Sequence, residues 1–135
     1  MDIKDANQLL SAFYLPFESG WKRLDTGVIT IAVRTHMIGC TPAMIDWWLG
    51  FLRRLLHLIQ ETREVCVMRS RFWLGEFDPV PNPKPTPETL QKMLPDELGA
   101  GLFAHCCEEM SILASFLPTV YRIHNADSER PKPTQ

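Results

Sequence analysis

His105 and Glu109 are the two side chains in this sequence whose types and spacing best suit catalytic chemistry. They are four residues apart, so on a helix they project from the same side, one turn from each other. An imidazole nitrogen and a carboxylate oxygen placed in this way can bind one Zn²⁺ ion at about 2.0–2.2 Å each. Pairs with this spacing also arise by chance, and most are solvated or hydrogen-bonded to each other. Spacing alone therefore leaves both interpretations open.

The pair belongs to a longer helical pattern. Residues at spacings of four and three form one mainly apolar stripe: Leu98, Leu102, His105, Glu109, Ile112 and Phe116. The stripe predicts a helix that begins at Pro95, ends near Phe116 and turns this side toward the core. A buried carboxylate is costly unless it is paired, protonated or bound to a cation. A core position for Glu109 would therefore favour a metal site.

Other polar side chains offer fewer partners. His57 lies between two leucines, where a histidine is either a core residue or a group that moves protons. Arg69 and Arg71 share one face of a predicted strand and are either solvated or, if that face lines a pocket, able to bind an anionic or phenolate group. The sequence contains neither a nucleophile elbow nor a glycine-rich phosphate loop.

The helices and strands that position these residues are predicted from the spacing of apolar residues and from residues that begin or interrupt such elements. Runs rich in β-branched residues predict strands at Val28–Met37 and Val65–Leu74. Thr41 and Pro42 are typical of a helix N-terminus. Five prolines between residues 77 and 87 exclude a helix interior or a central strand there. Strands and helices in this order predict an α+β fold.

The bulk composition predicts one soluble domain. The 135 residues are 45% hydrophobic and 22% charged. Residues 1–16 are predicted to form an N-terminal arm, residues 17–125 the domain and residues 126–135 a disordered polar tail. A chain of this length can bury a substantial core.

The net charge and the cysteines limit which partners and which cellular compartment the sequence predicts. The net charge of −2 supplies no basic field for nucleic acid, and no apolar run is long enough to predict a membrane span. The charged N-terminus does not resemble a secretory signal. The four cysteines lack CxxC spacing and are expected to be reduced, mainly core residues: Cys40, Cys66, Cys106 and Cys107. These features predict a cytoplasmic protein.

Three stretches, in order, resemble the signature blocks of one family. They are Thr26-Gly27-Val28 through TPAMIDWWLG at 41–50, MRSRFWLG at 68–75, and HCCEEM at 105–110 continuing through LASFLP at 113–118 to Tyr121. The family is the 2,4-diacetylphloroglucinol hydrolases, with the related phloretin hydrolases. The resemblance covers roughly residues 17–123, and three blocks in order make it specific.

The resemblance implies a zinc-dependent hydrolase that cleaves a carbon–carbon bond between an acyl group and a phloroglucinol-type ring. The substrate would be a small aromatic ketone. The implied fold is a helix-grip, or Bet v 1-like, arrangement in which a curved antiparallel sheet wraps a long C-terminal helix. The family's two zinc ligands on that helix match His105 and Glu109. Its pocket histidine, a catalytic residue, corresponds to His57.

The sequence departs from the family near residue 51, where a long segment of the family pattern is missing. That segment carries sheet strands and the two other zinc ligands, a histidine in a Trp-His-Pro context and a glutamate. Glu61 or Glu64 could supply a carboxylate instead, but two ligands alone do not make a stable zinc site. The alternative function is therefore a non-catalytic small-molecule-binding or interaction remnant of the family. Unpaired strand edges would also favour a homo-oligomer.

Overall fold

A four-stranded antiparallel sheet with one long helix against it forms the framework of the protein. The computed structural model describes residues 1–129 apart from 12, 50–55, 61 and 63. The elements are η1 (Ile3–Leu10, a 3₁₀ helix), β1 (Gly20–Arg23), β2 (Ile29–Ile38), α1 (Pro42–Leu49), β3 (Leu56–Gln60), β4 (Val65–Leu74), α2 (Pro87–Met93) and α3 (Asp96–Glu129). The strand order is β1-β2-β4-β3, with every neighbouring pair antiparallel. This architecture confirms the predicted incomplete α+β helix-grip fold.

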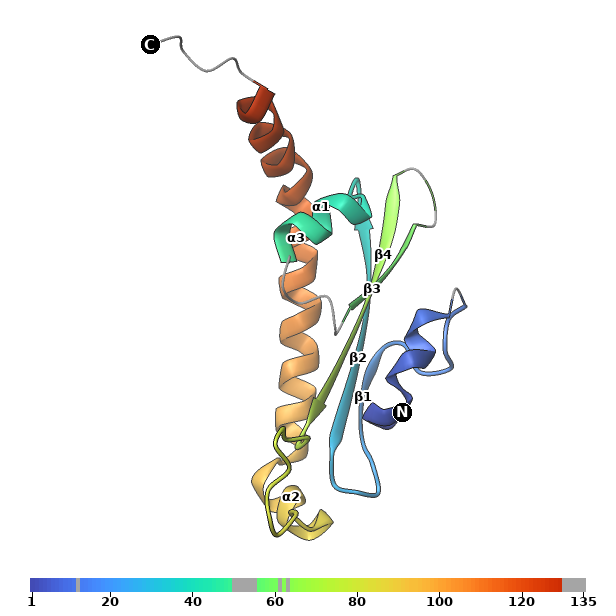
Figure 1. The fold of residues 1–135 in the computed structure, drawn as a ribbon, viewed down its shortest axis with the longest axis vertical. Helices are drawn as coiled ribbons and strands as arrows, with labels where there is room; N and C mark the ends of the chain where they lie inside the picture. The colour runs from blue at the N-terminus through green and yellow to red at the C-terminus, as the bar shows by residue number, and fades with distance from the viewer. Residues whose placement is uncertain (12, 50–55, 61, 63, 130–135) are drawn as a thin grey trace.

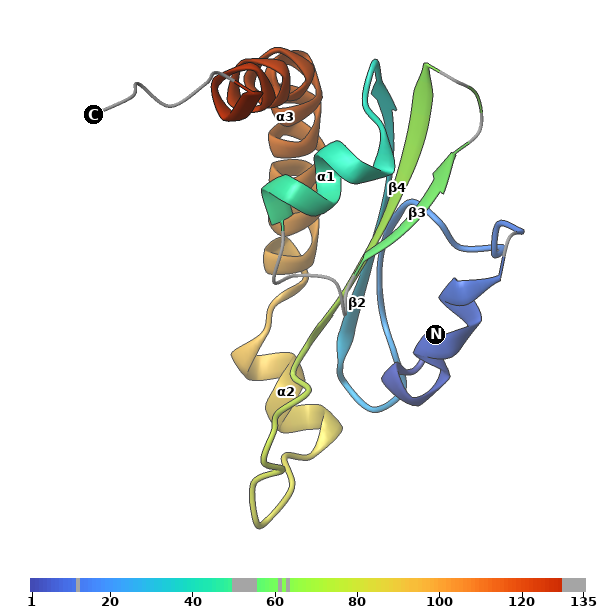
Figure 2. The same ribbon diagram turned by 45° about the horizontal axis from the view of Figure 1, so that its top comes forward.

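The two central strands are covered on both faces. Helix α3 lies along one face of the sheet, and the N-terminal segment with η1 lies along the other (Figures 1 and 2). All residues from Ile29 to Val33 are therefore buried, whichever face their side chains take. Ile29, Ile31 and Val33 form a cluster with Cys106 of α3. The near-continuous apolar run of β2 is what a strand buried on both faces requires.

Threonine side chains cap the starts of two helices. The hydroxyl of Thr41 accepts a hydrogen bond from the amide of Met44 at 3.3 Å at the start of α1. Thr86 caps α2 in the same way, accepting from the amide of Thr89 at 3.2 Å. Both threonines satisfy amides that a helix N-terminus otherwise leaves without a partner. The predicted start of α1 at Pro42 is confirmed.

Helix α3 is longer than predicted. It continues through Pro118 to Glu129, instead of ending near Phe116. A proline inside a helix removes one backbone hydrogen bond and pushes against the preceding turn. The helix bends in its C-terminal third (Figure 1). Of the predicted tail, residues 130–135 lie outside the described residues.

The predicted core-facing side of α3 is wrong. Leu98 and Ile112 of the predicted stripe are 44% and 54% exposed, whereas Cys106, Leu113 and Leu117 are buried. The helix is apolar around much of its girth, so spacings of three and four fit two adjacent faces. The face against the sheet includes Gly99, where α3 lies close to the side chains of Trp21 and Ile29. A Cβ added at Gly99 would lie 2.8 Å from Cε3 of Trp21.

Much of the apolar surface of α3 is not covered by the described residues. By length and composition alone the segment Asp96–Ala126 could cross a membrane, and only 17% of its most apolar window is buried. A helix that packs against a sheet has a similar composition, so this is weak evidence for a membrane. Two predictions about partners remain predictions: that the protein has no membrane partner and that it forms a homo-oligomer.

Leu117→Ala is expected to destabilise the protein strongly. Leu117 is fully buried in a cluster with Met37, Ile45 and Met68. Removing a buried leucine side chain costs about 2–5 kcal/mol of unfolding free energy, because it leaves a cavity. Urea denaturation measures this loss. Ile112→Ala, at an exposed position of the same helix, is the control, and equal losses for the two variants would contradict the observed orientation of α3.

Candidate functional site

His105 and Glu109 lie together, but at the surface. The Nε2 atom of His105 is 3.3 Å from Oε2 of Glu109, and the two side chains are 68% and 59% exposed. The expectation that both face the core is wrong, because the sheet covers the neighbouring face of α3. The carboxylate of Glu109 is hydrated at this position, so burial gives no argument for a cation there.

An apolar cavity of about 230 Å³ begins beside Glu109, between α1 and α3. Its lining residues are Trp48, Glu109, Met110, Ile112, Leu113 and Phe116. The rings of Trp48 and Phe116 meet edge to face with centroids 5.4 Å apart. His105 is not among the lining residues, so it meets this cavity only through Glu109. Two aromatic walls with a carboxylate at the rim suit a flat, apolar ligand that carries polar substituents.

The aromatic residues of α1 also brace the C-terminal part of α3. The ring centroid of Trp47 lies 5.5 Å from that of Tyr121 and 4.9 Å from that of His124. Trp47 and Trp48 are in contact with each other, with centroids 6.1 Å apart. The Trp-Trp pair of the sequence thus has two roles. Trp47 holds the two helices together, and Trp48 walls the cavity.

His57 is placed only by its backbone. It lies in β3, opposite Arg69 in the pairing with β4. Its side chain lies outside the described part of the protein. Its catalytic role stays a prediction.

The two arginines of β4 are buried instead of solvated. Arg69 and Arg71 are 0% and 1% exposed, on the sheet face covered by the N-terminal segment. Arg69 donates from Nε and Nη2 to the carboxylate of Glu18, at 3.1 and 2.6 Å. Sequence reasoning missed Glu18, because its partner is 51 positions away. The sequence signal that could have pointed to a buried acidic partner was the presence of two arginines in a mainly apolar strand.

Glu18 is ionised in this cluster. Burial acts to raise the pKa of its carboxyl, but hydrogen bonds from Arg69 and from the amide of Leu15, with the charges of Arg69 and Arg71, outweigh burial and lower the pKa. The Leu15 amide donates to Oε1 at 2.6 Å. This ion pair fastens residues 15–18 to the sheet.

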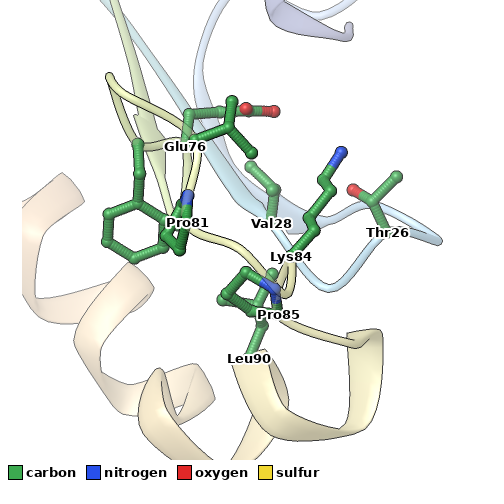
Figure 3. Close-up of a pocket in the computed structure, with 10 residues that line it drawn as sticks. Thr26, Val28, Glu76, Pro81, Lys84, Pro85 and Leu90 are labelled. Carbon is green, nitrogen blue, oxygen red and sulfur yellow. The ribbon is translucent and has the colours of Figure 1, made fainter.

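A second small cavity lies under the proline-rich loop (Figure 3). Val28, Pro81, Pro85 and Leu90 contribute to its walls, and its volume is about 30 Å³. That is the volume of about one water molecule, so an aromatic ring does not fit. This cavity is not a candidate substrate site.

The buried cysteines are not suited to nucleophilic catalysis. Burial, with smaller effects from Cys40 and Asp46, raises the pKa of the Cys66 thiol to about 11. Burial also raises the pKa values of the Cys40 and Cys106 thiols. A thiol must ionise to act as a nucleophile. Their interpretation as core residues agrees with these positions.

The donor set for zinc is incomplete within the described residues. Two ligands about 2.0 Å from a tetrahedral metal ion lie about 3.3 Å apart, which is the separation of the His105 and Glu109 atoms. The same separation suits a direct contact between the two side chains. No three His, Cys, Asp or Glu side chains are grouped so that they could hold one metal ion in the part of the chain that the structure describes. That part includes Glu64, whereas Glu61 lies outside it.

Comparison of the sequence with models of protein families shows the family of this chain. The model of the DAPG (2,4-diacetylphloroglucinol) hydrolase PhiG domain matches this sequence over residues 1–54 and 52–122. The chain belongs to the DAPG hydrolase family. The two matched stretches meet at residues 52–54, next to the predicted deletion near residue 51, which itself lies outside the described residues. Neither the curated proteins nor the solved structures include a significant match.

Glu18→Gln is expected to weaken the protein in a pH-dependent way. Because the folded-state pKa is lowered, the stability that Glu18 contributes is complete above its usual value of 4.5 and is lost as the pH falls through the folded-state value. Breaking a buried ion pair costs about 3–5 kcal/mol. Urea denaturation at several pH values should show the largest deficit near pH 7 and a smaller one in acid. The exposed Glu64→Gln is the control, and a deficit independent of pH would contradict this account.

Proposed function

We propose that this member of the DAPG hydrolase family hydrolyses the carbon–carbon bond between an acyl group and a phloroglucinol-type ring. Family membership supports a hydrolase. The observation that carries the assignment to a site is the carboxylate of Glu109 at the rim of a cavity walled by Trp48 and Phe116. The phenolic ring would lie between these aromatic walls, with its acyl group toward Glu109.

The chemistry follows from the tautomers of the ring. In its keto form, the bond between ring and acyl group becomes that of a β-diketone. Water adds to the acyl carbonyl, the carbon–carbon bond breaks, and its electron pair passes to the ring carbon, which takes up a proton. The products are a carboxylic acid and the deacylated phenol. In this scheme His105 and Glu109 lie beside the attacking water, either as proton acceptors or as ligands of the ion proposed below, and the ring carbon takes up a proton from solvent.

We further propose that His105 and Glu109 are two ligands of a Zn²⁺ ion. When bound, the ion would polarise an oxygen or lower the pKa of water. The separation of the two side-chain atoms supports this assignment. At least one further protein ligand is needed, so metal content is the measurement on which this part depends.

Hydrolysis of 2,4-diacetylphloroglucinol by the purified protein tests the function. Acetate release, followed by chromatography, is expected to fall by about 10²-fold or more in Glu109→Gln and His105→Ala, because each removes a group that handles protons or binds the metal. Elemental analysis should find zinc in the unaltered protein and a reduced content in both variants. Glu108→Gln, an exposed carboxylate one residue away, should change neither measurement.

Acetate release that survives both substitutions would contradict the role of the pair. Zinc content that is unchanged by His105→Ala would contradict the metal site. The two measurements are separable, since a metal-free hydrolase would fail only the second.

The alternative function is a non-catalytic module that binds the same aromatic ketones. The incomplete donor set within the described residues favours it. A rise in melting temperature on adding the ketone, without acetate release, would support binding alone. Trp48→Ala should abolish that rise, because it removes one wall of the cavity.

A further inference from the structure

One side of α3 carries a stripe of residues whose spacing is the same when it is read from either end. Successive members are separated by four, three, four, three and four residues: Leu98, Leu102, His105, Glu109, Ile112 and Phe116. Two large apolar residues stand at each end, and the ionisable pair stands in the middle. Alternating spacings of three and four are typical of a helix side that packs along another helix.

This stripe is largely uncovered. Leu98 and Ile112 are 44% and 54% exposed, and Leu102 and Phe116 are half-buried. The ionisable pair between them also lies at the surface. The sheet packs against a different side of α3 (Figure 1), so it leaves this apolar surface in contact with water. A second surface that covered the stripe would therefore stabilise the protein.

A second copy of α3 in the antiparallel orientation matches the stripe position by position. About a two-fold axis at position 107, residue 98 lies opposite 116, 102 opposite 112, and 105 opposite 109. Each large apolar side chain then meets another one, and each such contact occurs twice by symmetry. The histidine of each copy meets the glutamate of the other. A parallel pairing would instead place the two carboxylates opposite each other, which is repulsive.

The same pairing supplies the ligands for zinc that one chain lacks. One chain brings Nε2 of His105 and Oε2 of Glu109, which are 3.3 Å apart. No third donor is grouped with this pair among the residues that the structure describes. Two copies bring two histidines and two glutamates. Three protein ligands leave room for a water molecule on a tetrahedral zinc ion, and four complete it.

We propose that two copies of this chain pair antiparallel through the stripe and share one Zn²⁺ ion between their His105 and Glu109 side chains. The inference rests on the zinc role proposed above and adds the source of the missing ligands. Ile112 and Phe116 belong both to the stripe and to the cavity between α1 and α3. The second copy would therefore form part of the wall around the substrate.

Sedimentation velocity of the purified protein, with zinc or with EDTA, tests the shared site. With zinc we expect a dimer that contains one zinc ion for two chains. EDTA should weaken association about 10-fold or more, because metal binding energy is lost. His105→Ala should have the same effect in the presence of zinc, since it removes two of the four ligands. Glu108→Gln, an exposed carboxylate of α3 outside the stripe, is the control and should leave the dimer unchanged.

Leu98→Glu tests the apolar part of the interface without changing a metal ligand. A carboxylate opposite Phe116 of the second copy should weaken the zinc-loaded dimer about 10-fold or more, because it would lose its water in an apolar contact. Ile123→Glu is the matched control. Ile123 is 58% exposed on the same helix, but the position opposite it is 91, before α3 begins at Asp96. Circular dichroism checks that both variants fold.

Four results would contradict this inference, and they separate it from the proposed function. A monomer that binds one zinc ion per chain would overturn the sharing and leave the hydrolysis intact, since acetate release is measured independently. A dimer that is unaffected by EDTA and by His105→Ala would also overturn the sharing. Equal association of Leu98→Glu and Ile123→Glu would contradict the antiparallel contact. Absence of zinc binding would contradict both the shared site and the zinc role of the pair.

Discussion

β2 and β4 pair without interruption over ten residues each, from Ile29 opposite Leu74 to Ile38 opposite Val65. Every other part of the fold is attached to this ladder. Helix α3 packs on one face, the N-terminal segment covers the other, and β1 and β3 extend the sheet at its two edges. Side chains of β4 alternate between the two faces, so one strand contributes Met68 to the core under α3 and Arg69 to the ion pair with Glu18.

The two faces of the sheet are built from different interactions. Under α3 the contacts are apolar, and Gly99 lets the helix lie close to Trp21 and Ile29. Under the N-terminal segment a buried ion pair holds the chain, and Arg71 keeps two donor atoms that have no acceptor among the described residues. Buried charges of this kind add less stability than apolar packing of the same volume. They do specify how the segment lies, because Arg69 bonds to the carbonyl oxygens of Leu9 and Ser11 and to the carboxylate of Glu18, and Arg71 bonds to the carbonyl oxygen of Phe17.

Local patterns in the sequence were sufficient for the central strands and the start of α1. Alternation and β-branching identified β2 and β4, and Thr41 with Pro42 identified the start of α1, because these signals act within a few residues. The orientation of α3 was not predictable in this way. Two of its faces are apolar, and the choice between them depends on where Trp21 and Ile29 of the sheet meet the helix. The pairing of Glu18 with Arg69 was also missed, since no periodicity links residues so far apart.

For the candidate site, the sequence identified the residues but not their surroundings. The spacing of His105 and Glu109 correctly brings their side chains together, because helical geometry dictates it. Their exposure depends on how much of α3 the sheet covers, which no local pattern contains. Gly99 also affects how close α3 lies to the sheet. A helix is stiff over two turns, so the absence of a side chain at Gly99 sets the distance of this part of α3 from Trp21. His105 is about 9 Å further along the helix. The distance of His105 and Glu109 from the sheet thus depends on Gly99, which contacts neither of them.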